Sequence, residues 1–229
     1  MSGTSQALVL DFGGVVTRTL FETHDLTEAA LGLAPGTLTW RGPFDPEHDD
    51  LWRSMQAGEI SERDYWLHRA SETGRLVGRN WTRMADLVIA ARSAEPMKVI
   101  RPEALDAIDR ARAAGHRLAV LSNELDLFYG ADFRDKLPFL KRFDLIVDAT
   151  YTDILKPDPR AYAFVTDGLG IPPAACVFVD DQFRNIEGAR RAGMHAVHFD
   201  VRNPAAGYAG ALALLGLAPN RTEAGHDAA

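Results

Sequence analysis

Four short strand-like runs, each followed by polar side chains, form the most regular pattern of the chain. They lie at residues 8–10, 116–121, 144–147 and 176–179. Continuous runs of Leu and Val bounded by Gly are typical of strands that are buried on both faces of a parallel sheet. From Pro102 onward these runs alternate with segments of helical pattern. This alternation predicts an α/β fold with a doubly wound, Rossmann-like parallel sheet.

The segments between the runs predict the helices of this fold. Pro102 and Pro159 suit the first turn of a helix, where the missing backbone N–H has no partner to lose, and Gly115 and Gly170 suit helix ends. The expected helices span residues 102–114, 125–136, 159–169, 183–192 and 205–215.

A long insertion interrupts the strand pattern. Between the first and second runs the periodic segments 49–56 and 61–72 indicate helices. We therefore expect a catalytic core of residues 1–17 and 97–219 and an inserted helical cap of residues 18–96. The polar tail, residues 220–229, is predicted to be disordered.

Polar side chains follow the strand-like runs in a fixed order. Asp11 follows the first run, Ser122 the second, Lys156 lies in the loop after the third, and Asp180 and Asp181 follow the fourth. In an open parallel sheet these ends lie on one edge, and ligands bind in the crevice there. The sequence therefore predicts one site that contains all five side chains.

These residue types in this order resemble the haloacid dehalogenase superfamily. Its four motifs are a nucleophilic Asp, a Ser or Thr, a Lys and a terminal acidic pair. The segments Asp11-Phe12-Gly13-Gly14-Val15 and Val179-Asp180-Asp181, the latter followed by Asn185-Ile186-Glu187-Gly188, are similar to a branch that includes glucose-1-phosphatases and the phosphatase domain of soluble epoxide hydrolase. The resemblance implies a hydrolase with a helical cap.

The charges of the predicted site indicate a metal ion. A close pair of carboxylates costs about 4 kcal/mol at an effective dielectric constant near 20, so Asp11, Asp180 and Asp181 call for a divalent cation. Oxygen ligands with room for water and a phosphate oxygen suit Mg²⁺. The resemblance adds the backbone carbonyl of Gly13 as a ligand, whereas we expect Asn185 to tie down the loop by hydrogen bonds.

The remaining residues predict a cradle for a phosphoryl group. Lys156 supplies a positive charge, and the Ser122 hydroxyl and the backbone amides near Phe12, Gly13 and Asn123 supply hydrogen-bond donors. Asp11 would attack the phosphorus and form an aspartyl-phosphate that water hydrolyses. We therefore predict a Mg²⁺-dependent phosphatase that acts on a small phosphorylated metabolite, with sugar phosphates among the candidates.

Two positions depart from the family pattern. Gly13 stands where most phosphatases of the superfamily carry a second Asp that acts as general acid and base, a role typically worth 10² to 10⁴-fold in rate. The sequence leaves three outcomes open: a substrate with a good leaving group, a replacement from the cap or water, or low activity. Asp153 stands where relatives often have Gly, which affects the shape of the loop before Lys156.

Two alternatives to a phosphatase follow from the same residues. Hydrolytic dehalogenation of a 2-haloacid also uses an Asp nucleophile and needs no general acid, so Gly13 fits it, whereas Asp180 and Asp181 would repel a carboxylate substrate. The second alternative is a catalytically weak domain that binds a phosphorylated metabolite. The intact Asp11 and Lys156 disfavour that reading.

The inserted segment offers candidates for substrate contact. All four tryptophans of the chain lie in this segment: Trp40, Trp52, Trp66 and Trp81. We expect most of them to pack the core of a small helical bundle. The pair Trp40-Arg41, in a stretch rich in Gly and Pro, is our candidate for substrate binding.

Composition limits the partners and the compartment. The 229 residues carry a net charge of −7, which disfavours nucleic acid and anionic lipid as partners. Cys176 is the single cysteine, so no internal disulfide can form, and its place in an apolar run predicts a buried thiol. With no signal peptide or membrane span in the sequence, we expect a cytoplasmic protein. The sequence does not predict an oligomeric state.

Overall fold

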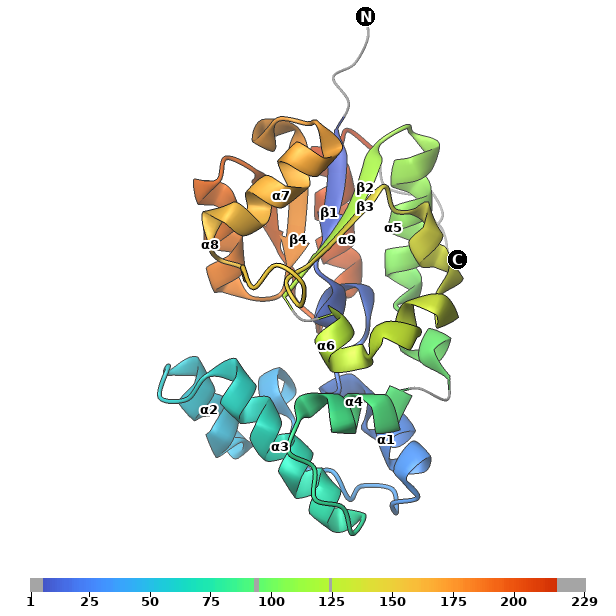
Figure 1. The fold of residues 1–229 in the computed structure, drawn as a ribbon, viewed down its shortest axis with the longest axis vertical. Helices are drawn as coiled ribbons and strands as arrows, with labels where there is room; N and C mark the ends of the chain where they lie inside the picture. The colour runs from blue at the N-terminus through green and yellow to red at the C-terminus, as the bar shows by residue number, and fades with distance from the viewer. Residues whose placement is uncertain (1–5, 93–94, 124, 218–229) are drawn as a thin grey trace, which may run out of the picture. The chain divides into compact units, whose positions relative to one another are not determined.

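The computed structural model describes residues 6–92, 95–123 and 125–217 (Figure 1). The chain divides into two compact units. The first comprises the chain up to Val16, Arg101–Asn123 and the chain from Phe139 onward, and the second comprises Thr17–Ile100 and Glu124–Pro138. The predicted tail, residues 220–229, lies outside the described residues.

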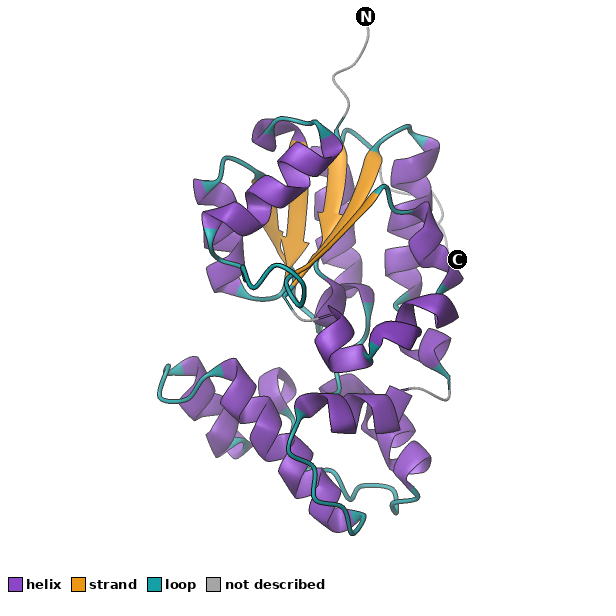
Figure 2. Cartoon of the chain, viewed as in Figure 1, coloured by secondary structure: helices purple, strands orange, loops and turns teal. Residues whose placement is uncertain are grey.

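The first unit is built on a five-stranded parallel sheet (Figure 2). Its strands are β1 (Ala7–Leu10), β2 (Arg117–Ser122), β3 (Leu145–Asp148), β4 (Cys176–Asp180) and β5 (His195–His198). The strand order is β3-β2-β1-β4-β5, so the chain moves outward from β1 first on one side and then on the other. This order confirms the predicted doubly wound α/β fold.

Helices cover both faces of this sheet. The helices α5 (Pro102–Ala113) and α9 (Pro204–Leu214) pack together on one face, and α7 (Pro159–Leu169) and α8 (Phe183–Arg191) pack on the other (Figure 1). These four helices lie within one or two residues of the predicted ranges. Pro102 and Pro159 occupy the first turn, as predicted, and Pro204 does the same in α9.

The central strands of the sheet are buried throughout. All four residues of β1 and all five of β4 are inaccessible or nearly so, as expected for strands covered on both faces. Cys176 at the start of β4 is buried, as predicted, and burial raises the pKa of its thiol to about 11. Tyr162 of α7 packs on Phe178 of β4, with ring centroids 5.7 Å apart.

Strand β5 and the segment 125–136 differ from the sequence prediction. Strand β5 was not predicted, because His195 and His198 at its ends are exposed and only two apolar residues lie between them. The predicted helix over 125–136 is interrupted at Gly130, whose φ of 81° no right-handed helix contains, so the chain forms α6 (Leu125–Tyr129) and a separate 3₁₀ helix (Ala131–Lys136).

The second unit is helical. Its α-helices are α1 (His24–Leu31), α2 (Asp50–Gln56), α3 (Glu62–Leu76), α4 (Met84–Arg92) and α6. Short helical turns of the chain lie at Phe21–Thr23, Gly42–Phe44, Pro46–His48, Pro96–Val99, Pro138–Arg142 and Pro173–Ala175, whereas Phe12–Val16 is an irregular turn. The prediction found α2 and α3 but not α1 and α4.

Aromatic side chains fill the core of the second unit. Phe21 lies at its centre, within 5.2 to 6.1 Å of the rings of Trp40, Trp52, Tyr65 and Trp66. A small bundle needs such large residues to bury enough apolar surface. Trp40 is only 4% exposed, so its indole ring belongs to this core.

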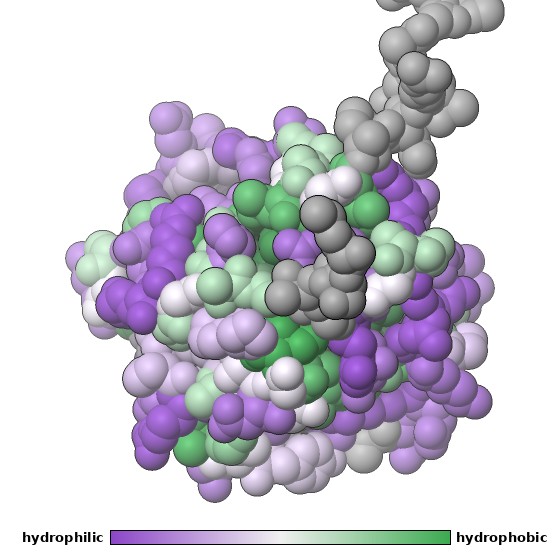
Figure 3. Space-filling model, turned by 90° about the horizontal axis from the view of Figure 1, so that it is seen from above, coloured by the Kyte–Doolittle hydropathy of each residue, from purple (hydrophilic) through white to green (hydrophobic). Residues whose placement is uncertain are grey.

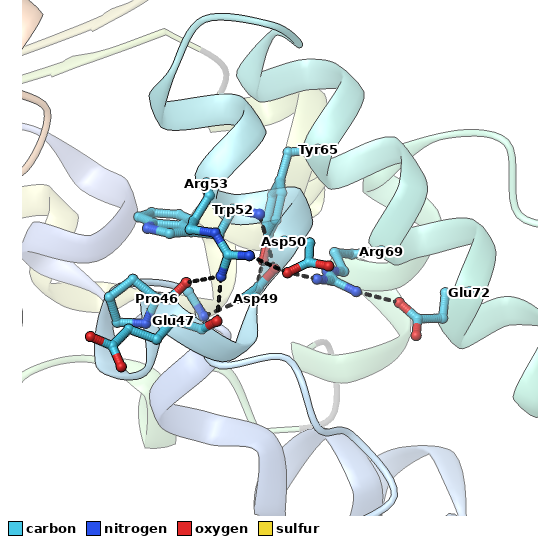
Figure 4. A network of polar contacts seen from close by, with 10 residues as sticks. Pro46, Glu47, Asp49, Asp50, Trp52, Arg53, Tyr65, Arg69 and Glu72 are labelled. Atoms are coloured by element: carbon cyan, nitrogen blue, oxygen red, sulfur yellow. Dashed lines mark hydrogen bonds and ion pairs between the residues drawn. The ribbon is translucent and has the colours of Figure 1, made fainter.

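A buried carboxylate, Asp49, organises one end of the second unit (Figure 4). It caps α2 by accepting a hydrogen bond from the amide of Trp52 at 2.9 Å, and it accepts others from the amide of Gly42 and the hydroxyl of Tyr65. Arg69 of α3 completes the set with an ion pair at 2.6 Å. These contacts satisfy a charge that burial alone would destabilise.

The grouping of the chain differs from the expected domain boundaries at Thr17, at residues 97–100 and at residues 125–138. We expected these residues in the core, but α6 packs on α4 within the second unit. At the crossings between units, Thr17 pairs with Ile100 in an isolated bridge, and the amide of Arg101 donates to the carbonyl of Val16 at 3.0 Å. That the second unit acts as a cap stays a prediction.

The described part of the chain contains no helix that is both long and apolar enough to cross a membrane. The face seen in Figure 3 carries mainly hydrophilic residues around its margin, with hydrophobic residues gathered toward its middle.

The contact between α8 and α7 provides a test of the packing. A Cβ added to Gly188 would lie 2.5 Å from the Tyr162 hydroxyl and 2.8 Å from the Cβ of Pro157. We expect Gly188→Ala to lower the free energy of unfolding by about 1–3 kcal/mol through overpacking, as measured by urea denaturation.

The matched control is Gly210→Ala in α9. A Cβ there would meet no atom nearer than 3.9 Å, so the gain in helix propensity should stabilise this variant by about 0.5–1 kcal/mol. Equal effects of the two substitutions would contradict the packing of Gly188 against α7.

Candidate active site

Asp11 lies directly after β1, at the carboxyl edge of the sheet. Its amide donates to the carbonyl of Val179 at 2.9 Å, which extends the β1–β4 ladder by one residue and fixes the backbone of Asp11. The side chain is 13% exposed. Gly14, with a φ of 80°, then turns the chain away from the strand direction.

Two buried residues that the sequence analysis did not identify hold this turn. Arg101 donates from Nε to the carbonyl of Gly14 at 3.0 Å, and the Tyr208 hydroxyl donates to the carbonyl of Val15 at 2.9 Å. Both come from helices or loops far along the chain, so no local pattern could reveal them. They satisfy carbonyls that the irregular turn leaves outside any ladder.

Lys156 joins the first and fourth motifs. Its ammonium donates to Oδ1 of Asp11 and to Oδ2 of Asp180, each at 2.7 Å, and its side chain is 1% exposed. Its main chain is held by Asn123, which accepts from the Lys156 amide at 2.7 Å and donates to the Lys156 carbonyl at 3.2 Å. The Lys156–Pro157 peptide bond is cis.

Asp180 is inaccessible and bound on both oxygens. Oδ1 accepts from the amide of Gln182 at 2.8 Å, and Nδ2 of Asn185 donates to both oxygens at 3.1 Å. Asn185 is itself positioned by its carbonyl, which accepts from the Tyr162 hydroxyl at 2.7 Å. This arrangement agrees with the expectation that Asn185 ties down the loop.

Three carboxylates converge at this edge. One oxygen from each of Asp11, Asp180 and Asp181 lies within 4.8 Å of the other two, a spacing that a metal ion can bridge. The buried Oδ1 of Asn185 has no hydrogen-bond partner among the described residues, which leaves a further oxygen beside Asp180. Such an all-oxygen set fits a hard divalent cation.

The positive and negative charges of this cluster do not cancel. Burial, together with the neighbouring carboxylate of Asp180, raises the pKa of Asp11 to about 7, against the opposing effect of Lys156. Burial alone would lower the pKa of Lys156, but the charges of Asp11 and Asp180 hold it above its ordinary value. One ammonium between two buried carboxylates leaves a net negative charge, which favours binding of a cation.

Ser122 is brought to the same edge at the end of β2, 6% exposed, and its hydroxyl has no partner among the residues that the structure describes. Asn123 uses its side chain on Lys156, which leaves its backbone amide for the predicted role. Phe12 is buried, with its ring in the core, and Gly13 is exposed in the turn. The functions assigned to these residues stay predictions.

Trp40 and Arg41 lie in the second unit. Trp40 belongs to the aromatic core, and Arg69 lies 5.8 Å from the centre of its ring. Arg41 is exposed. A role in substrate binding for this pair stays a prediction.

Two further features of this edge concern β3 and the loop that follows. Asp148 ends β3 opposite Ser122 and is 5% exposed. Asp148 was not predicted, although it shows the same signal, a polar residue at the end of an apolar strand.

Asp153 adopts a φ of 55°, the left-handed region that glycine enters without strain, which explains why a relative can carry Gly there.

A model of the haloacid dehalogenase-like hydrolases matches residues 6–193 of the sequence. The chain belongs to this family. The match covers strands β1 to β4 and all four motifs, so the resemblance inferred from the strand-end residues is confirmed.

Curated relatives of this hydrolase include a phosphatase and a dehalogenase. Phosphatase MT3486 of Mycobacterium tuberculosis is 33% identical over 99 residues, 43% of this chain and 46% of that protein. (S)-2-haloacid dehalogenase 4A of Burkholderia cepacia is 32% identical over 100 residues, 43% of this chain and 42% of that protein. The chain thus spans less than half the length of either relative.

Solved structures show the same fold. A HAD phosphatase from Thermococcus onnurineus has a TM-score of 0.52 at 19% identity, with 85% of this chain and 86% of that chain covered. L-2-haloacid dehalogenase from Xanthobacter autotrophicus has a TM-score of 0.56 at 22% identity, with 86% and 78% covered. The fold of the hydrolase is therefore shared by enzymes of both kinds.

The raised pKa of Asp11 predicts a pH dependence of stability. Between its unfolded value of 3.8 and its folded value of about 7, the native state binds more protons at Asp11 than the unfolded state does. The contribution of Asp11 is therefore fully present below the unfolded pKa and is lost as the pH rises toward 7. In chelator-treated protein, the unfolding free energy of the wild type should fall more over this range than that of Asp11→Asn, as measured by urea titrations at successive pH values. Parallel curves would contradict the raised pKa.

Proposed function

We propose that this hydrolase is a Mg²⁺-dependent phosphatase that acts on a small phosphorylated metabolite through an aspartyl-phosphate intermediate. The observation that carries the proposal is the convergence of Asp11, Asp180 and Asp181 within 4.8 Å, with the Lys156 ammonium bound to two of them. Asp11, Asp180, Asp181 and the carbonyl of Gly13 would hold the metal. Bound Mg²⁺ would neutralise the carboxylates and stabilise negative charge on the transferred phosphoryl group.

In the first step Asp11 acts as nucleophile. A carboxylate oxygen attacks phosphorus, the bond from phosphorus to the ester oxygen breaks, and that oxygen leaves with the electron pair. Lys156 holds the Asp11 carboxylate in position through the bond at 2.7 Å, and its charge lies where negative charge develops. The Ser122 hydroxyl and the backbone amides after β1 and β2 would bind the phosphoryl oxygens.

In the second step water attacks the phosphorus of the aspartyl-phosphate, which releases phosphate and regenerates the Asp11 carboxylate. Gly13 cannot donate or accept a proton, so the leaving oxygen must depart as a stable anion or take its proton from another source. This requirement favours substrates with good leaving groups, such as anomeric sugar phosphates and acyl or aryl phosphates. The predicted branch, similar to glucose-1-phosphatases, accords with this preference.

Dehalogenation of a 2-haloacid is the second candidate. It is supported by Gly13, because halide leaves as an anion and needs no general acid, and by the dehalogenase among the relatives at 32% identity. The three converging carboxylates count against it, because they would repel a carboxylate substrate. A protein that only binds a phosphorylated metabolite would not require an ion pair between Lys156 and a nucleophilic Asp11.

Hydrolysis of para-nitrophenyl phosphate tests the proposal. We expect phosphate release that requires Mg²⁺, disappears with a chelator and falls by at least about 10³-fold in Asp11→Asn, equivalent to about 4 kcal/mol of barrier, because the nucleophile is lost. The control is Asp106→Asn on α5, an exposed carboxylate that forms an ion pair with Arg110 and should not affect activity when replaced.

Three results would decide against the phosphatase. Phosphate release that a chelator does not reduce would remove the metal site from the reaction. Chloride release from 2-chloropropionate without metal would establish the dehalogenase instead. If neither substrate reacts but phosphorylated sugars raise the melting temperature, the protein is a binding domain.

A further inference from the structure

His198 makes a contact that the proposed chemistry does not use. It ends strand β5, and its Nε2 lies 3.0 Å from the backbone carbonyl oxygen of Asp181. Because a carbonyl oxygen only accepts, Nε2 of His198 must carry the proton and donate it. The imidazole is thereby bound to the main chain of one member of the acidic cluster.

The contact between His198 and Asp181 lies directly beyond the last residue pair of strands β4 and β5. His198 lies opposite Asp180 in the β4–β5 register, and the last backbone bond of this ladder runs from the Phe199 amide to the carbonyl of Asp180 at 2.9 Å. The carbonyl of Asp181 is the next along the chain and lies beyond the strand. The His198 side chain supplies a donor to this carbonyl, where the ladder offers none.

A second contact holds the imidazole in place. The ring of Phe183, the first residue of α8, packs edge-on against His198 with centroids 5.6 Å apart and an interplanar angle of 72°. Such edge-to-face pairs are favourable and directional. His198 is therefore held between α8 and the carbonyl of Asp181, although it is exposed.

We propose that His198 is a positioning residue for the divalent-cation site: by fixing the backbone of Asp181, it keeps the Asp181 carboxylate within bridging distance of Asp11 and Asp180. The inference rests on the proposed function, because it assumes that this cluster binds Mg²⁺. Asp180 is held by Lys156, Gln182 and Asn185, and Asp11 by Lys156 and the sheet. His198 is the corresponding support for Asp181.

Isothermal titration of Mg²⁺ into purified protein tests this role without any substrate. His198→Phe keeps an aromatic ring against Phe183 but removes the donor. We expect its dissociation constant for Mg²⁺ to rise about tenfold, the lower end of the range for residues that orient metal ligands. His198→Gln, which retains an N–H donor, should recover most of the affinity. His195→Phe at the exposed start of the same strand is the matched control and should bind Mg²⁺ like the wild type.

Activity measurements add a second readout. If His198 positions the site, the Mg²⁺ concentration for half-maximal activity of His198→Phe should rise, while kcat at saturating Mg²⁺ stays close to that of the wild type. A merely structural role would lower the metal-free melting temperature without changing the Mg²⁺ affinity.

The failures of the two proposals are distinguishable. Equal Mg²⁺ affinities of the wild type and His198→Phe, or equal losses in His198→Phe and His195→Phe, would overturn the role of His198 and leave the phosphatase intact. Failure of the wild type itself to bind Mg²⁺ would overturn both. Should His198→Phe not fold, His198→Leu removes the same donor and is measured in its place.

Discussion

One ammonium group between two buried carboxylates governs the organisation of this site. The Nζ of Lys156 is 2.7 Å from both Asp11 and Asp180, the side chains of Lys156 and Asp180 are almost inaccessible, and that of Asp11 is mostly buried. Removing one member of such a set leaves uncompensated buried charge, typically at a cost of about 3–5 kcal/mol. The ends of β1 and β4 and the loop before α7 are therefore tied together by electrostatics as well as by the sheet.

Neighbouring side chains hold the members of this set in place. Asn123 accepts a hydrogen bond from the main chain of Lys156. Asn185 donates to both oxygens of Asp180, and its own carbonyl accepts from the Tyr162 hydroxyl of α7. Gly188 lets α8 approach Tyr162 and Pro157 closely enough for this support. The cluster keeps an excess of negative charge, which a cation and a phosphoryl group can satisfy together. Its rigidity and its charge therefore come from the same contacts.

The carboxyl edge of the sheet was predictable from sequence because parallel strands put their ends together. Asp11, Ser122, Lys156, Asp180 and Asp181 each follow a buried run, and the alternation of strands and helices fixes the edge on which they meet. Arg101 and Tyr208 were not predictable, because they reach the turn after Asp11 from distant segments. Strand β5 was missed because its ends are exposed histidines.

The buried state of Cys176 has a practical consequence for study of the two units. The chain has a single thiol, its side chain is buried in the first unit, and its raised pKa keeps it protonated and unreactive at neutral pH. Maleimide dyes would therefore react selectively with cysteines introduced on the surface, without removal of the native one. A fluorophore pair attached to α3 and α7 could thus test, by energy transfer, whether the distance between these helices changes when a ligand is added.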